Sequence, residues 1–408
     1  MHLELNSRGR FAAGAVALAM GLAACMHAAD VEIVKAGSIK TALSLKGMRA
    51  DSQAASKTFR KVLEADLVRS GWFEIAVGGA SVDVSGFCQG SGDRLTGQCR
   101  VVNNIAGKTL LSEQLRGQVA NPRQLAHRTA DAIVKAVKGV PGIASTQIVM
   151  VGARVGRQDL YLCDADGARL RRATHDGAVC LSPSWGKGVL EILYTSFHNG
   201  YPDAYRIDLG GGRRIRLAAY PGLNTGAVLS PDGRRIAMTL SKDGNPDLYV
   251  KDLRSGVLSR ITRTAYAAEA SPSWSPDGRQ LVFVSDRAGR PQLYVQALYG
   301  KTAKRLTYEG RENAAPDWAA DGRIAYSSRR GGTYEICIYD PVARRHTQLT
   351  RGDGDWEDPS WAPDSRHIVC TRTSGYRSHL YILDVMGDPP LRLTSSEGDW
   401  YSPDWSSQ

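Results

Sequence analysis

The sequence predicts a small α/β domain followed by an all-β, six-bladed β-propeller, and three features that repeat along residues 146–408 carry this prediction. The first is a Trp or Leu beside a turn rich in Ser, Pro, Asp and Gly, with copies 43 to 45 residues apart. An apolar triplet usually centred on Tyr and an apolar pair usually ending in Thr keep the same spacing, as an internal repeat requires. The first series occupies Trp185, Leu229, Trp274, Trp318, Trp361 and Trp405.

Each repeat contains four short strand patterns. In one copy these are residues 272–274, 280–285, 292–295 and 304–307, with Gly, Asp, Asn and Pro between them. A period near 44 with four strands is typical of a propeller blade and not of a helical repeat. We expect each Trp to pack between neighbouring blades and each Pro-Asp-Gly to form a turn, so both features have a structural role.

The two ends of the array predict how the ring closes. It begins with Ile148–Val151, which has the pattern of a second strand with no first strand before it. It ends with Pro403–Trp405, a first strand with nothing after it. The C-terminal strand therefore completes the blade that Ile148 begins, which removes the open edges of the ring and gives six blades.

Residues 30–144 lack the repeat and predict a separate α/β domain with two helices against a mixed sheet. Apolar residues at helical spacing predict one helix over 56–70 that stops at Gly71. A second helix begins with Asn121 as its cap and Pro122 in its first turn, and residues 139–142 end it and form the linker. The predicted strands are 31–34, 73–77 and a meander of 82–87, 98–102 and 109–115.

Residues 1–24 have the pattern of a bacterial export signal, with Arg8 and Arg10 before an apolar stretch over 11–24. This stretch is too short for a membrane-spanning helix and no other reaches 18 apolar residues, so we expect no transmembrane segment. Two cleavage sites remain open. Residues 22–25 resemble a lipobox, which would make Cys25 a lipidated N-terminus that tethers the protein, whereas cleavage after Ala28 would give a soluble protein.

Cysteines, histidines and charge limit the kinds of site that the chain offers. Cys88 and Cys99 flank a turn over 91–93, and because export permits disulfides we predict one between them; the partners of the other four cysteines stay open. No C-x-x-C occurs and the 8 His are scattered, so we expect no metal and no cofactor. The net charge is +11, but Lys and Arg are spread along the chain, which argues against nucleic-acid binding.

In the order of its segments the chain resembles the TolB family of the bacterial Tol–Pal envelope system. The resemblance rests on the export signal, the start at 30–34, the helix end over 67–73 and the six blades that end near Trp405. Segments 240–242 and 285–292 are also similar to loops of the family. The resemblance implies a periplasmic protein that maintains outer-membrane integrity and couples envelope constriction to cell division.

The resemblance also implies two protein partners. In the family the propeller binds the peptidoglycan-associated lipoprotein Pal through loops that lead into the Trp strands, and the N-terminal strand region binds the C-terminal domain of TolA. A family His falls at Leu223 here, which is a departure, as is the lipobox. By position, the Pal-like contacts are Leu223, Asn224, Thr225, Gly226, Glu269, Ala270 and Ser271, and the TolA-like contacts are Asp30, Val31, Glu32, Ile33 and Val34.

Six loops of one type converge on one face of a propeller, so the interface is expected on a single face. Trp356 and Trp400 lie in two of these loops, outside the Trp register. Exposed aromatic residues ringed by polar ones are typical of binding hot spots, so one interpretation makes both indoles partner anchors. The other makes each indole a cap on its own blade, and both interpretations remain open.

Two other classes of function are known for propellers. A peptidase of the prolyl-oligopeptidase type needs a Gly-x-Ser-x-Gly elbow and a further α/β unit, and neither is seen in the sequence. A metal-centred enzyme needs a repeated set of ligands, which is also not seen. A carbohydrate- or peptidoglycan-binding module stays open. We therefore expect a monomer that binds proteins and is not an enzyme.

Overall fold

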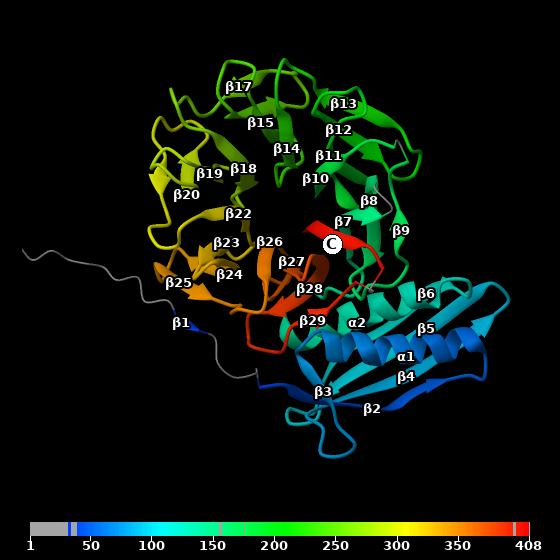
Figure 1. The fold of residues 1–408 in the computed structure, drawn as a ribbon. Coiled ribbons are helices and arrows are strands. Elements are labelled where there is room, and N and C mark those ends of the chain that lie inside the picture. Colours follow the sequence, from blue (N-terminus) through cyan, green and yellow to red (C-terminus); the bar gives the residue numbers. More distant parts are fainter. Residues whose placement is uncertain (1–31, 34–38, 155–156, 176, 395–396, 408) are drawn as a thin grey trace, which may run out of the picture.

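The computed structural model describes residues 32–33, 39–154, 157–175, 177–394 and 397–407, which form a ring of six β-sheets with a small α/β domain at its side (Figure 1). The predicted export signal, Cys25, Asp30, Val31 and Val34 lie outside the described residues. Among the described residues, no helix is both long enough and apolar enough to cross a membrane.

The N-terminal domain contains one mixed five-stranded sheet, in the order β3-β2-β4-β5-β6. β2 is parallel to both β3 and β4, and β4, β5 and β6 form the predicted antiparallel meander. β2 is an internal strand that the sequence prediction missed. The bounds are β2 Thr41–Ala50, β3 Phe73–Ile75, β4 Val82–Ser91, β5 Arg94–Asn103 and β6 Lys108–Gln118.

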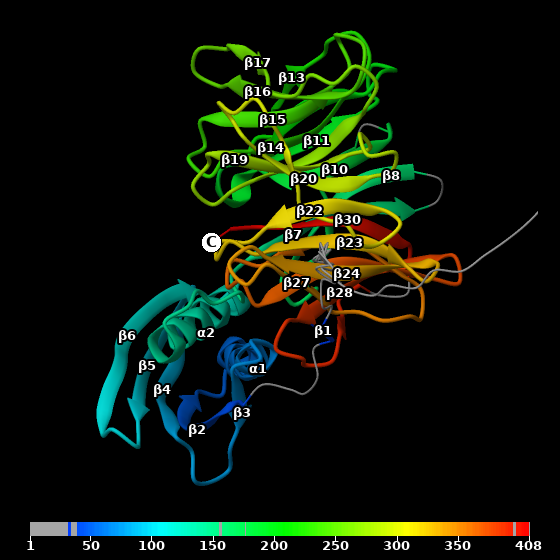
Figure 2. The same cartoon turned by 90° about the vertical axis from the view of Figure 1, so that its left-hand side faces the viewer.

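Two helices, α1 (Ala54–Arg69) and α2 (Pro122–Lys138), cover the face of this sheet that is turned toward the propeller (Figure 2). Both were predicted, and α2 has the predicted ends. The Asn121 side chain accepts a hydrogen bond from the Gln124 N–H at 3.4 Å, and Gly139 ends the helix at a φ of +74°. Their apolar stripes and the sheet share one core.

The propeller has six blades, as predicted, and each blade is a sheet that contains four antiparallel strands of the repeat. In the first two complete blades the strands are β10 Cys180–Trp185, β11 Glu191–Ser196, β12 Asp203–Asp208 and β13 Arg214–Ala218, then β14 Asn224–Leu229, β15 Arg235–Leu240, β16 Asp247–Asp252 and β17 Leu258–Arg260, with a short 3-10 helix at Gly188–Leu190. The next three blades contain β18 Glu269–Trp274, β19 Gln280–Ser285, β20 Gln292–Ala297 and β21 Lys304–Arg305; β22 Asn313–Trp318, β23 Ile324–Arg330, β24 Thr333–Asp340 and β25 Arg345–Gln348; and β26 Asp355–Trp361, β27 His367–Ser374, β28 Arg377–Asp384 and β29 Leu391–Arg392.

The closing blade joins the two ends of the array, as predicted. β30 (Asp399–Trp405) pairs with β7 (Gln147–Arg154), which continues into β8 (Arg157–Asp164) and β9 (Arg171–Arg172). The register places Trp405 opposite Ile148. The predicted roles of the repeated residues also hold: the Trp274 indole N–H donates to the Val228 carbonyl of the neighbouring blade at 3.1 Å.

Inner strands β10, β14, β18, β22, β26 and β30 define two faces of the ring. We call the face where these strands begin the loop face, and the face where the Pro-Asp-Gly turns lie the turn face. The N-terminal domain rests on the turn face: Arg366 donates to the Gly71 carbonyl at 3.0 Å and lies 4.2 Å from the Trp72 ring, and Lys40 pairs with Asp388 at 2.8 Å. Figure 2 shows this domain beside the C-terminal end of β30.

The strand predicted over residues 31–34 pairs with the propeller and not with the sheet of the N-terminal domain. Residues 32–33 form β1 (Glu32–Ile33), which pairs in parallel with β25 as a fifth strand of a propeller blade. The prediction that this segment is a strand of the N-terminal domain was therefore wrong. The cause is physical: an outer blade edge offers unpaired backbone groups to any nearby extended segment.

The predicted disulfide is absent, and Cys88 and Cys99 are both free and buried. They lie on adjacent strands, but the register places Cys88 opposite Gly97 and Cys99 opposite Gly86. Because a cross-strand disulfide needs two directly facing residues, this offset of two residues prevents the bond. Burial raises the pKa of the Cys88 thiol to about 11 and that of Cys99 to about 12, so both are inert apolar side chains.

Candidate docking face and central channel

All six inner strands carry the same irregularity, three residues before the Trp position. The register with the second strand shifts there, and the residue has a positive φ of 46° to 62°. This is a β-bulge, which bends a strand and re-aims the side chains that follow it. The six residues are Ser182, Gly226, Ser271, Ala315, Asp358 and Ser402.

These bulges surround a central channel of 680 Å³ whose lining includes both carboxyl and hydroxyl groups. Asp317 accepts from the Ser273 hydroxyl at 3.3 Å and from the Trp361 N–H at 2.7 Å. One blade pair further on, Asp404 accepts from the Ser360 hydroxyl at 3.2 Å and from the Trp185 N–H at 2.7 Å. Each carboxylate therefore links its own inner strand to the inner strands of the two neighbouring blades.

Two carboxyl groups of the channel have pKa values that are raised toward neutral pH. Asp317 and Asp404 are half-buried and face the narrow channel instead of bulk water. Burial raises the pKa of Asp317 to about 6, and burial together with the charge of Asp317 raises the pKa of Asp404 to about 7. Near neutral pH the propeller therefore carries partly protonated carboxyl groups on its axis.

Stability should consequently fall as the pH rises from about 4 to about 7. The folded state binds the protons of Asp317 and Asp404 more tightly than the unfolded chain, so their contribution is lost as the pH rises through the folded pKa. Each unit of raised pKa is worth about 1.4 kcal/mol, and we expect the wild type to lose at least that amount across this range. Urea unfolding of Asp404→Asn at pH 4 and 7 should show a smaller loss; an equal loss would contradict this account.

Asn224 was predicted to contact a partner, but the structure gives its side chain no access to one. Its side chain is fully buried at the start of β14. The side-chain oxygen accepts from the Tyr220 N–H at 2.9 Å, and the side-chain nitrogen donates to the Tyr220 carbonyl at 2.8 Å and to the Pro202 carbonyl at 3.2 Å. Asn224 therefore shapes the loop before β14 from inside and has no group left for a partner.

Glu269 was also predicted to contact a partner and is equally buried. Its carboxylate accepts from the Ser285 hydroxyl at 2.9 Å and from Arg287 at 3.1 Å, and Thr264 completes the set at 3.0 Å. Burial raises the pKa of Glu269. The residue therefore fixes the loop before β18, and its carboxylate has no access to solvent through which it could meet a partner.

The two Trp residues outside the register cap blades. Trp356 and Trp400 are 6% and 0% exposed. Trp400 meets the Tyr161 ring edge-on at 5.0 Å and donates to the Glu397 carbonyl at 2.8 Å, and Trp356 meets Tyr381 at 5.3 Å. The blade-cap interpretation is therefore confirmed, and neither indole is available as an exposed anchor.

Five of the residues predicted to contact a partner are at least partly exposed to solvent. Leu223, Thr225, Gly226 and Ala270 are half-buried and Ser271 is exposed. Gly226 and Ser271 line the central channel, so the structure brings them together there. The Thr225 hydroxyl lies 2.9 Å from the Thr195 hydroxyl of the neighbouring blade. Thr225 and Ser271 lie within β14 and β18, not on loops as expected.

The most exposed aromatic side chains of the loop face are tyrosines, which the sequence analysis missed. Tyr266 and Tyr308 lie in loops that lead into inner strands and are 98% and 73% exposed. Tyr201 and Tyr376 lie in turns between second and third strands and are also exposed. The sequence contained a signal for the exposure of Tyr201 and Tyr376, because each directly follows a Gly of a turn.

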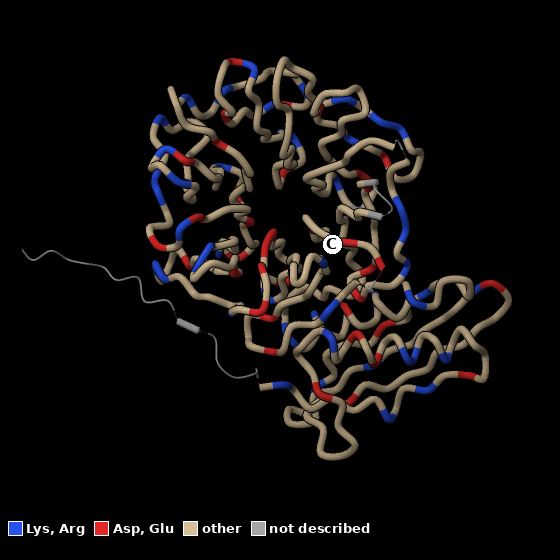
Figure 3. The backbone as a smooth tube through the Cα atoms, viewed as in Figure 1, with Lys and Arg blue, Asp and Glu red and all other residues tan. Residues whose placement is uncertain are grey.

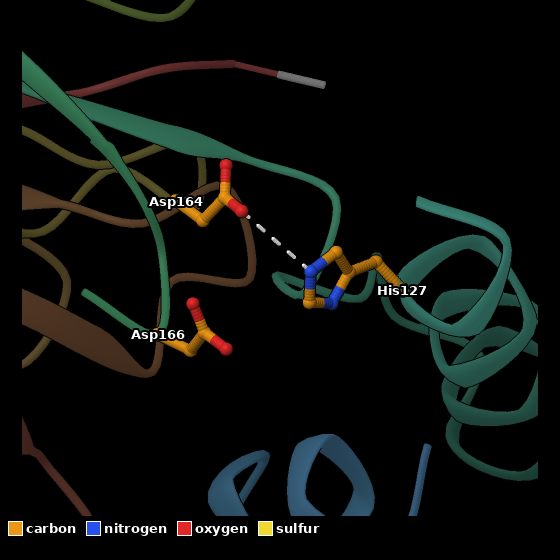
Figure 4. A group of neighbouring side chains, drawn as sticks. All are labelled: His127, Asp164 and Asp166. Atoms are coloured by element: carbon orange, nitrogen blue, oxygen red, sulfur yellow. Dashed lines mark ion pairs between the residues drawn. The ribbon is translucent and has the colours of Figure 1, made fainter. Parts of the chain in front are cut away.

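One cluster of charged side chains lies outside the channel, at the contact between the domains. Among the described residues, His127, Asp164 and Asp166 are the one group of three with potential metal-ligating atoms close together (Figure 4). Arg169 already donates two hydrogen bonds of 2.7 Å to Asp164, and Arg123 pairs with Asp166. A divalent ion would add buried positive charge to carboxylates that are already paired, so this donor set does not fit a metal.

Comparison with known proteins identifies the family. The family described as the TolB beta propeller domain matches residues 134–408, more than half of the chain. The chain belongs to the TolB family. The structure of TolB from Acinetobacter baumannii is similar with a TM-score of 0.81 and 29% identity, over 92% of this chain and 98% of that one. A putative TolB from Agrobacterium tumefaciens, at 19% identity and a TM-score of 0.50, shares the fold.

Similar TolB sequences from other bacteria support the same family. The TolB homolog of Protochlamydia amoebophila is 36% identical over 263 residues, which are 58% of this chain. This chain spans 56% of the length of that relative. The Tol–Pal system protein TolB of Anaeromyxobacter dehalogenans is 31% identical over 296 residues, 65% of this chain and 67% of that protein.

Proposed function

We propose that this TolB-family chain is a periplasmic component of a Tol–Pal system and that its loop face docks the globular domain of a Pal-like lipoprotein. In this role it would maintain the outer membrane and couple envelope constriction to cell division. The observation that carries the proposal is the loop face itself, which bears four exposed tyrosines while the N-terminal domain rests on the opposite face. Tyrosine supplies large contact area at a low entropic cost, which suits a docking surface.

The rigidity of this face supports the same proposal. Asn224 and Glu269 hold two of its loops from inside, so these loops lose little conformational freedom when a partner binds. The test is calorimetry of the purified lipoprotein domain against the full chain. Saturable 1:1 binding is the expected result, and no heat of binding at micromolar concentrations would contradict the proposal.

A carbohydrate-binding role is the second candidate, because exposed tyrosines also stack on sugar rings. Soluble peptidoglycan fragments in the same calorimeter distinguish the two candidates. Binding of the lipoprotein domain without binding of the fragments supports protein docking, whereas binding of the fragments alone supports the second candidate.

We further infer that residues 30–34 bind the C-terminal domain of a TolA-like protein. The support is the behaviour of residues 32–33, which pair through their backbone with the outer strand β25. A partner domain with an open strand edge would offer the same hydrogen bonds.

Replacement of residues 30–34 by a Gly-Ser segment of equal length should abolish binding of the TolA-like domain. Lipoprotein binding and the melting temperature should stay unchanged, because the loop face and the blade cores are untouched. Ile39→Ala, at a fully exposed residue near this segment, is the matched control. Calorimetry with both partners is the measurement, and undiminished TolA-domain binding by the Gly-Ser variant would contradict the inference.

The state of the N-terminus is decided by the mass of the mature protein. A chain that begins at an acylated Cys25 is tethered to a membrane, whereas one that begins at Ala29 without an acyl group is not.

A further inference from the structure

His127 lies at the contact between the two domains, with its ring facing Asp164 (Figure 4). Its side chain comes from α2 and is 2% exposed. The Nδ1 atom is 2.7 Å from an Asp66 carboxylate oxygen of α1, and the Nε2 atom is 3.8 Å from an Asp164 carboxylate oxygen of the propeller. One imidazole ring therefore faces a carboxylate of each domain.

The other charged groups around the ring balance one another. Arg69 of α1 and Arg123 of α2 both face Asp166 of the propeller, and Arg169 holds Asp164. The remaining carboxylate, Asp131 of α2, accepts from the backbone N–H groups of residues 144 and 145 in the linker, at 2.8 and 2.9 Å. Three guanidinium groups thus match the carboxylates of residues 66, 164 and 166 before His127 is counted.

A neutral imidazole fits this position poorly. If Nδ1 donates its hydrogen to Asp66, a neutral ring turns the Nε2 lone pair toward the Asp164 carboxylate. The buried Nε2 atom has no hydrogen-bond partner that would compensate for this repulsion. A proton on Nε2 converts the repulsion into an ion pair across the domain contact and adds only one positive charge.

We propose that His127 is an imidazolium ion that latches the N-terminal domain onto the propeller, and that loss of its proton loosens the contact between the domains. Burial opposes the charge, but the carboxylates of Asp164 and Asp66 outweigh burial and raise the pKa of His127 to about 9. Burial also raises the pKa of Asp66. A protonated His127 therefore faces an ionised Asp66 in a pH window that begins above the pKa of Asp66 and ends near 9.

The sign of the effect follows from the raised pKa of His127. The contribution of this proton to stability is complete below the ordinary histidine pKa of about 6.5 and is lost as the pH rises through about 9. This window lies above that of the channel carboxyl groups, whose contribution is lost by about pH 7. The two effects are therefore separable in one pH series.

Two measurements on the full chain test the proposal. In the wild type, long-range ¹H–¹⁵N NMR of the His127 ring should show an imidazolium at pH 7 and a titration midpoint near 9. Hydrogen exchange in residues 139–146, corrected for the intrinsic rate, should be at least about tenfold faster at pH 10 than at pH 7, which corresponds to ~1.4 kcal/mol. His127→Gln should exchange fast at both pH values. His346→Gln, at a half-buried ring in the blade of β22–β25, should behave as the wild type.

A midpoint below 7, or the same pH-dependent exchange in His127→Gln as in the wild type, would overturn the proposal. So would release of one equivalent of metal by EDTA at pH 7 with the same increase in exchange, because the bridging cation would then be a metal ion. If His127→Gln does not fold, the wild-type titration decides alone.

Discussion

Removal of Ser402–Gln408 is expected to abolish soluble, folded protein. The deletion takes away the end of β30, including Trp405, which is buried and whose indole N–H donates to the Thr146 hydroxyl at 2.7 Å. It also takes away Asp404, which accepts from the Trp185 N–H. β7 would lose its pairing at Val149 and Ile148, and the ring would gain an open edge there, so unfolding and aggregation should both follow. Loss of one buried Trp alone costs about 3–5 kcal/mol, a large share of the stability of a typical domain.

The matched control is a deletion of residues 407 and 408 only. Ser407 is exposed, and Ser406, which donates to the Gln147 carbonyl at 2.9 Å, is kept. This shorter variant should be as soluble as the wild type and melt at the same temperature. A Ser402–Gln408 deletion that stays soluble with unchanged melting would show that the ring does not depend on this closure.

Trp400→Ala is expected to lower the free energy of unfolding by about 3–5 kcal/mol, the usual cost of emptying the space of a buried Trp. Trp400 is fully buried and packs among side chains of the closing blade and of the blade of β26–β29, including Met150, Tyr161 and Leu380. The substitution leaves a cavity between two blades and removes the edge-on contact with Tyr161. Urea unfolding followed by circular dichroism measures the loss.

Tyr376→Ala is the control, because Tyr376 is fully exposed on the same face and should change stability by less than about 0.5 kcal/mol. The opposite pattern would contradict the account: near-normal stability of Trp400→Ala with weakened partner binding would make this indole an exposed anchor after all.

The repeat made the propeller predictable from the sequence. Six copies of one pattern fix the blade number, and two incomplete copies at Ile148 and Trp405 fix the closure. Local signals also placed α2, because Asn121, Pro122 and Gly139 act within a few residues of the helix ends. These features depend on short-range rules that need no knowledge of the tertiary structure.

Burial within loops was not predictable in the same way. Asn224 and Glu269 are polar and stand beside turn residues, which favours exposure, yet both fold back to hold the backbone of their own loops. β2 was missed because Lys46, Gly47 and Arg49 interrupt its apolar positions. The offset of Cys88 and Cys99 depends on strand register, which the spacing of two cysteines does not reveal.

The central claim is that the loop face docks a Pal-like lipoprotein, and calorimetry with tyrosine variants tests it most directly. Tyr266→Ala combined with Tyr308→Ala removes two exposed rings from the loop face, and Tyr299→Ala removes a ring of 96% exposure from the turn face. The account predicts at least a tenfold loss of lipoprotein affinity, ~1.4 kcal/mol or more, for the double variant, no loss for Tyr299→Ala, and equal melting temperatures for all three proteins. Unchanged affinity of the double variant, or an equal loss in Tyr299→Ala, would contradict docking on this face.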